Sequence, residues 1–150
     1  TKASGAKVTH VFSKPGRYRP VLKVTDSHGN VDYDFARVTV ADPDIPPGKR
    51  CYLHAAYWPT LGIRAGDEVT FLVRSFRFEP REGEELWDFG DGSPPVRTRS
   101  DGCVDAHNKD GYAQITHRFQ KAGHYIVSVR RINSDGQMAV DKLDVRVAPP

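Results

Sequence analysis

Several absences narrow the protein classes to which this sequence can belong. It contains two cysteines, and no apolar run approaches the roughly 20 residues that a membrane-spanning helix needs. Acidic and basic residues are interspersed, the net charge is +3, and there is no basic block of the kind that follows a phosphate backbone. We therefore expect neither a membrane span nor a nucleic-acid partner.

The sequence also has few signals for helices. Apolar residues do not recur at the spacing of an amphipathic helix, and 13 glycines and 11 prolines interrupt the chain. Alternation with a period of two is clearer, as at Val69, Phe71 and Val73. Strands are expected at residues 18–26, 31–40, 52–57, 68–76 and 86–89, with a further hairpin over 125–147. Many short strands separated by turn residues predict an all-β, antiparallel β-sandwich.

One stretch of the chain occurs twice. Residues 6–18 read AKVTHVFSKPGRY and residues 113–125 read AQITHRFQKAGHY, so that position 9 corresponds to position 116, a shift of 107. A repeat of this length is a whole domain rather than one unit of a solenoid. The second copy has room for a complete domain, whereas the first copy begins in its middle. We therefore predict a tandem of two domains in which the first is truncated.

A short motif in the second copy combines aromatic, glycine and acidic residues. It consists of Trp87, Asp88, Phe89, Gly90, Asp91 and Gly92. The two aromatic residues lie two positions apart, so they share one face of a strand and can fill the space between two sheets. The glycines permit a tight reversal, and the aspartates can accept hydrogen bonds from the backbone of the turn. We favour these structural roles over a calcium site or a catalytic acid–base pair.

The motif resembles that of the polycystic-kidney-disease (PKD) domain family. Residues 116–119 and 121–125 extend the resemblance, and the first copy shares the later half of the pattern at residues 12–18 and 24–30. The resemblance implies an immunoglobulin-like β-sandwich. It also implies a location outside the cell or at its surface. Modules of this family usually occur in extracellular multidomain proteins as spacers, adhesion modules or accessory modules beside catalytic domains.

The resemblance and the repeat together predict the domain organisation. Residues 1–42 are expected to be the C-terminal part of a first PKD-like domain, residues 43–48 a stiff proline-rich linker, and residues 49–148 a complete PKD-like domain. The first segment lacks the sheet partners that normally precede it, and a lone hairpin is marginally stable in water. It should therefore pair with another copy, pack on the second domain, or belong to a longer protein.

The two copies share a glycine followed by a tyrosine at the start of a strand. Gly16 precedes Tyr18, and Gly123 precedes Tyr125. In immunoglobulin-type sandwiches, a tyrosine near such a corner can return a hydrogen bond from its hydroxyl group to the backbone a few residues upstream. We expect both tyrosines to do so.

A long insertion over about residues 93–112 departs from the family pattern. Long ordered loops often carry specific binding, so this loop is the candidate ligand site. Its polar and aromatic candidates for a glycan or protein ligand are Arg97, Arg99, Asp101, Asp105, His107 and Tyr112. The alternative is a solvated insertion that packs on its own domain.

Calcium could be bound by oxygens of the same loop, although the sequence does not match an EF-hand. These oxygens would come from Asp101, Asp105, Asn108 and Asp110. His107 has no second histidine at ligand spacing, so zinc is not indicated. No other cofactor is expected.

Three further places in the sequence carry predictions of their own. Cys51 and Cys103 can form a disulfide that pins the loop, which an extracellular context favours, or can remain free thiols. Arg131 continues the inward phase of its strand, so we expect it to reach water at an open strand end or to pair with an aspartate of the motif. Tyr57 and Trp58 are expected to close an edge of the sandwich, the alternative being that they stack on a sugar.

These features favour a non-catalytic extracellular spacer or adhesion module. The second hypothesis is a carbohydrate- or protein-binding accessory module of a secreted enzyme that degrades polysaccharide or protein, acting through the 93–112 loop. An enzyme is not expected, because no nucleophile with a neighbouring base can be argued from the sequence. The expected partners are neighbouring domains of the parent chain, a polysaccharide or protein ligand, and another copy that pairs with the truncated first domain.

Overall fold

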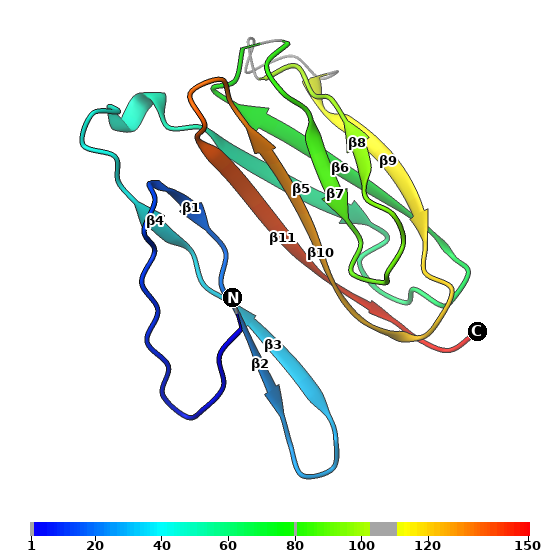
Figure 1. Ribbon diagram of the computed structural model, residues 1–150. Helices are drawn as coiled ribbons and strands as arrows, with labels where there is room; N and C mark the ends of the chain where they lie inside the picture. The colour runs from blue at the N-terminus through cyan, green and yellow to red at the C-terminus, as the bar shows by residue number, and fades with distance from the viewer. Residues whose placement is uncertain (1, 80, 103–110) are drawn as a thin grey trace.

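The computed structural model describes residues 2–79, 81–102 and 111–150, and its regular secondary structure consists of β-strands and one short 3-10 turn (Figure 1). The strands are β1 (Gly16–Tyr18), β2 (Val21–Thr25), β3 (Val31–Phe35), β4 (Val38–Val40), β5 (Tyr52–Trp58), β6 (Glu68–Phe76), β7 (Glu85–Asp88), β8 (Val96–Thr98), β9 (Ala113–Arg118), β10 (Gly123–Ile132) and β11 (Met138–Val147). A 3-10 turn, η1 (Pro47–Lys49), lies in the proline-rich linker. The described residues contain no helix with the length and apolar character needed to cross a membrane.

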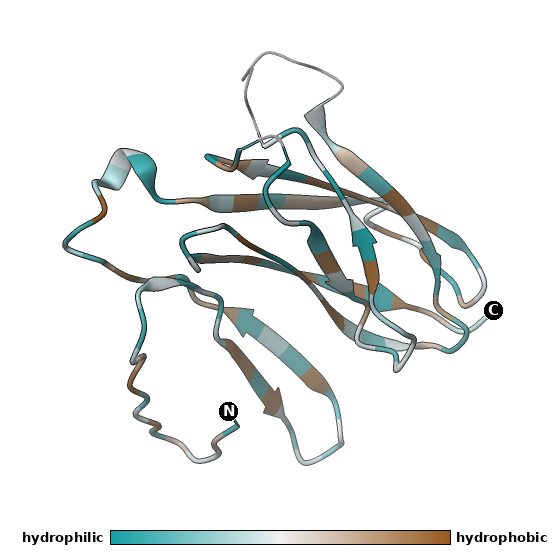
Figure 2. Cartoon of the chain, turned by 45° about the horizontal axis from the view of Figure 1, so that its top comes forward, coloured by the Kyte–Doolittle hydropathy of each residue, from teal (hydrophilic) through white to brown (hydrophobic). Residues whose placement is uncertain are grey.

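Strands β5 to β11 form a sandwich of two antiparallel sheets. The strand order is β5-β6-β9 in one sheet and β11-β10-β7-β8 in the other. Alternation along β6 buries Val69, Phe71 and Val73 completely, and Trp87 and Val127 cover them from the opposite sheet. Figure 2 shows the resulting change between apolar and polar residues along the strands. The prediction of an all-β, immunoglobulin-like antiparallel sandwich is therefore confirmed.

The N-terminal segment forms two short antiparallel ladders, β1–β4 and β2–β3, beside the sandwich (Figure 1). Tyr18 pairs with Val38, and 107 positions later Tyr125 pairs with Val145; the other pairs of these ladders recur in β10–β11 in the same register. The ladder is continuous in β10–β11. In the N-terminal segment it is interrupted near Pro20, whose nitrogen has no hydrogen to donate. The sequence repeat is thus also a repeat of strand geometry.

The two tyrosines that begin these ladders make equivalent contacts. The hydroxyl group of Tyr18 donates to the carbonyl oxygen of Lys14 at 2.6 Å, and that of Tyr125 donates to the carbonyl oxygen of Lys121 at 2.9 Å. In both copies the hydrogen bond reaches back four residues and fixes the corner that leads into the strand.

The N-terminal segment packs on the sandwich. The guanidinium group of Arg19 lies 2.7 Å from one carboxylate oxygen of Asp141, and the other oxygen of Asp141 accepts the backbone N–H of Ala55 at 3.0 Å. Nearby, the rings of Tyr33 and His124 meet edge to face with 4.6 Å between their centroids. Of the three arrangements expected for this segment, the structure shows packing on the second domain.

The prediction for Arg131 is wrong. Its side chain is 1% exposed, and its guanidinium group donates to the Glu85 carboxylate at 2.9 Å instead of reaching water or an aspartate of the motif. The sequence indicates a strand only from residue 86, but β7 begins one residue earlier, at Glu85, which is completely buried. The side chain of Arg131 does point inward, as the alternation of its strand predicts, but its partner is a buried carboxylate.

The two aromatic residues at the end of β5, Tyr57 and Trp58, lie in different environments. The hydroxyl group of Tyr57 donates to the carbonyl oxygen of Asp144 at 2.6 Å, which joins the edges of the two sheets. Trp58 is 69% exposed, so the expectation that both residues close the edge is wrong for Trp58. The alternation of β5 buries Leu53 and Ala55 and therefore places Trp58 on the outer face of the strand.

Candidate functional site

The aromatic residues of the motif at residues 87–92 lie between the two sheets. Trp87 is completely buried, and its indole N–H donates to the hydroxyl group of Thr98 at 3.0 Å. The ring of Phe89 stacks on His117 of β9 with 3.9 Å between centroids. Because β7 and β9 belong to different sheets, this packing fastens the sheets to each other.

Both aspartates of the motif accept hydrogen bonds within the turn. Asp88 accepts the N–H of Gly90 at 2.9 Å, and Asp91 accepts the N–H and the hydroxyl group of Ser93 at 3.0 and 2.6 Å. The second oxygen of Asp91 lies 2.7 Å from Nε2 of His117. Burial raises the pKa of Asp91, but the hydrogen bonds from Ser93 and the contact with His117 outweigh it and hold this pKa below its ordinary value. Such a carboxylate is poorly suited to be a general base, which works best with a pKa near the operating pH.

A buried polar cluster lies at the start of β7; it consists of Ser75, Glu85, Ser100 and Arg131. The Glu85 carboxylate accepts the hydroxyl groups of Ser75 and Ser100 at 2.5 and 2.6 Å, in addition to the guanidinium group of Arg131. The ring of Phe78 lies 4.6 Å from Cζ of Arg131. Sequence reasoning missed this cluster, although Glu85 lies on the same face of the strand as the aromatic pair of the motif. Its role is structural, since a buried charge pair needs such hydrogen bonds to be tolerated.

Two candidates of the 93–112 loop share one acidic partner. The guanidinium groups of Arg97 and Arg99 lie 3.5 and 3.2 Å from the carboxylate of Glu84. Both arginine side chains are largely exposed, so these ion pairs contribute little to stability. They leave the arginines accessible to a ligand.

Two other candidates of the loop meet at its base. The carboxylate of Asp101 lies 3.3 Å from the guanidinium group of Arg74, whose Cζ is 5.4 Å from the ring centroid of Tyr112. The N–H of Asp101 donates to the carbonyl oxygen of Gly111 at 3.2 Å. Among the described candidates, two arginines thus contact Glu84, whereas Asp101 and Tyr112 contact Arg74. The structure does not bring the four side chains to one common partner.

Some predictions fall on residues that the structure does not describe. Asp105, His107 and Cys103 lie outside the described residues, as do Asn108 and Asp110 of the predicted calcium site. Within residues 2–79, 81–102 and 111–150, no three histidine, cysteine, aspartate or glutamate side chains are grouped in a way that could hold a metal ion. Calcium binding by the loop stays a prediction.

The disulfide between Cys51 and Cys103 can be tested by mass. Cys51 is 4% exposed, and burial raises the pKa of its thiol, so slow alkylation of the folded protein would not distinguish a disulfide from a protected thiol. Alkylation should therefore be done in denaturant. We expect no modification without reductant and two added groups after reduction; two added groups without reductant would contradict the disulfide.

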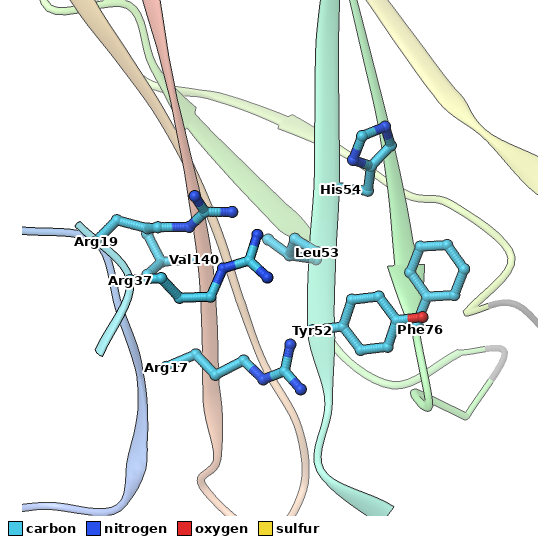
Figure 3. A pocket seen from close by; sticks show the side chains of 8 residues that line it. All are labelled: Arg17, Arg19, Arg37, Tyr52, Leu53, His54, Phe76 and Val140. Atoms are coloured by element: carbon cyan, nitrogen blue, oxygen red, sulfur yellow. The ribbon is translucent and has the colours of Figure 1, made fainter. Parts of the chain in front are cut away.

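Sequence reasoning also missed a group of arginines between the N-terminal segment and the sandwich, here called the arginine pocket (Figure 3). Its lining residues are Arg17, Arg19, Arg37, Tyr52, Leu53, His54, Phe76 and Val140. The spacing of two between Arg17 in β1 and Arg19 directly after it could have indicated one basic face. Arg37 directly precedes β4, and the antiparallel pairing of β1 with β4 brings it to the same end of the ladder as Arg19, which the spacing in the sequence alone does not reveal.

Comparison with known protein families agrees with the fold and with the motif. Residues 54–146 match the family described as PKD domain, and this match covers more than half of the 150 residues. PKD domains are generally non-catalytic modules and are typically extracellular. Their presence in a chain suggests a role in protein interaction. The matched residues span β5 to β11 almost completely, including the motif at residues 87–92 and the tyrosine corner at Tyr125. The chain belongs to the PKD domain family.

Proposed function

We propose that this chain is a non-catalytic extracellular spacer that holds a preceding module in a fixed orientation against the PKD sandwich. The observation that carries the proposal is the contact of Arg19 with Asp141. Asp141 is 5% exposed and also accepts the N–H of Ala55 in β5. A charge pair shielded from water is screened much less than one at the surface. It therefore ties the N-terminal segment to both sheets.

The partners in this proposal are the neighbouring domains of the parent chain. We assign residues 1–42 to a preceding PKD-like module because their strands repeat the register of β10–β11. Leu22 and Val24 of the β2–β3 hairpin are 59% and 55% exposed. Further strands of that module, or a second copy of the chain, would cover these apolar side chains.

A binding role through the 93–112 loop is the second candidate function. It is supported by the side chains of Arg97 and Arg99, which are 66% and 46% exposed and lie side by side on one carboxylate. A polysaccharide or protein with acidic groups could compete with Glu84 for them. The binding role ranks second because, among the described residues, the candidates of the loop contact two different partners and do not line one site.

Residual dipolar couplings test the spacer proposal directly. Amide couplings of residues 16–40 and of residues 52–147 should fit one common alignment tensor, because the Asp141 contact makes the two parts tumble as one body. Arg19→Gln should make the two tensors diverge. Arg130→Gln, which removes the same charge from an exposed position on β10, should leave them equal. Two independent tensors in the unaltered protein would refute rigid spacing.

A further inference from the structure

The arginine pocket is a cavity of about 210 Å³ between the N-terminal segment and strands β5, β6 and β11. Figure 3 shows the guanidinium groups of Arg17, Arg19 and Arg37 extending from one side toward the strand that carries Tyr52 and His54 on the other. Three positive groups therefore converge on one small space. Such convergence is costly unless negative charge lies among them.

Only part of this positive charge is balanced within the described residues. Arg19 is paired with Asp141 at 2.7 Å, and that carboxylate also accepts the N–H of Ala55. No carboxylate of the described residues lies within ion-pair distance of Arg17 or Arg37. Two guanidinium groups of the pocket thus have their charge available for a ligand.

Arg17 is held in place for such a role by aromatic packing. Its Cζ lies 4.9 Å from the centroid of the Tyr52 ring, which stacks on Phe76 with 4.4 Å between centroids. The Nε–H of Arg17 is buried, and no acceptor in the described residues reaches it. Burial, followed by the charges of Arg37 and Arg77, lowers the pKa of Arg17, which is the direction that crowded cations produce.

We propose that the arginine pocket binds a small oxyanion, a sulfate or carboxylate group, either as a free ion or carried by an acidic sugar. Guanidinium groups present paired N–H donors that match the oxygens of such groups. Pockets for drug-sized ligands measure roughly 300–1,000 Å³, so this cavity suits a single charged group rather than an extended ligand. The proposal does not depend on the spacer function, because it concerns binding alone.

The test is a titration of the whole chain followed by NMR. Sodium sulfate and, separately, sodium glucuronate are added while sodium chloride keeps the ionic strength constant. We expect saturating shifts of the Arg17 Nε–H signal and of the backbone amides of Tyr52 and His54. Tighter binding of sulfate would identify a sulfate group as the ligand, and tighter binding of glucuronate would identify a carboxylate carried by a sugar. Shifts that do not saturate with either anion would overturn the proposal.

Two variants of equal charge separate site binding from general attraction. Arg37 is exposed, so Arg37→Gln should leave the fold intact while weakening anion binding about tenfold or more, as expected for loss of a charged hydrogen-bond donor. Arg130→Gln removes the same charge from β10, outside the pocket, and should leave the dissociation constant within about twofold. Equal weakening by both variants would show that net charge alone attracts the anion, and the site would be rejected.

Discussion

Replacing Arg131 with methionine is expected to lower the free energy of unfolding by about 3–5 kcal/mol, the usual cost of breaking a buried ion pair from one side. The reason is the Glu85 carboxylate, which is completely buried and would lose the cation that lies 2.9 Å away. Methionine fills a similar volume, so the loss reports charge rather than a cavity. Urea unfolding measures it.

Arg130→Met is the matched control for this prediction. Arg130 is the preceding residue of β10, and it is exposed on the opposite face of the sheet. Its replacement should change stability by no more than about 0.5 kcal/mol. Similar losses for Arg130→Met and Arg131→Met would mean that the buried pair contributes nothing special.

A second substitution in the Arg131→Met background identifies the cause. Glu85→Gln removes the stranded charge but keeps the side-chain shape and can still accept the hydroxyl groups of Ser75 and Ser100. The double variant should therefore be more stable than Arg131→Met alone. A further loss on adding Glu85→Gln would instead show that the ionised carboxylate is held adequately by its hydroxyl donors.

The sheets of the sandwich were predictable because their sequence signal is local. Alternation at Val69, Phe71 and Val73 gives β6 with the bounds that the sequence indicates. The motif around Trp87 likewise predicts its own burial, since an indole two residues from a phenylalanine has one strand face to occupy. These inferences need no knowledge of which strands become neighbours.

The buried pair and the arginine pocket were not predictable to the same degree, because their partners are far apart in the chain. The phase of β10 indicates that Arg131 points inward, but only the pairing of β7 with β10 brings Glu85 to it. In the pocket, Arg17 meets Tyr52 only after the N-terminal segment has packed on β5. A charged residue at an inward position of a strand is therefore better interpreted as a sign of a buried partner of opposite charge than as a sign that the strand end is open to water.

Substituting alanine for Gly90 should be one of the most damaging changes in the motif. The residue has a φ of 73°, a left-handed conformation that costs other residues about 1–2 kcal/mol. A Cβ at this position would also lie 2.8 Å from the carbonyl oxygen of Ile126, which belongs to the backbone of β10 and cannot turn aside like a side chain. Forcing the two strands apart adds about 1–3 kcal/mol, so we expect a total loss of about 2–5 kcal/mol in urea unfolding.

Gly92→Ala separates the two causes within the same turn. Gly92 has a φ of 87°, but no atom lies within 4 Å of the position of an added Cβ. Alanine there should bring only the conformational cost of about 1–2 kcal/mol. The difference between the two variants then measures how tightly the turn is pressed against β10. Equal losses would mean that the glycines serve the shape of the turn alone, whereas a larger loss at Gly90 shows that the motif also sets the distance between β7 and β10.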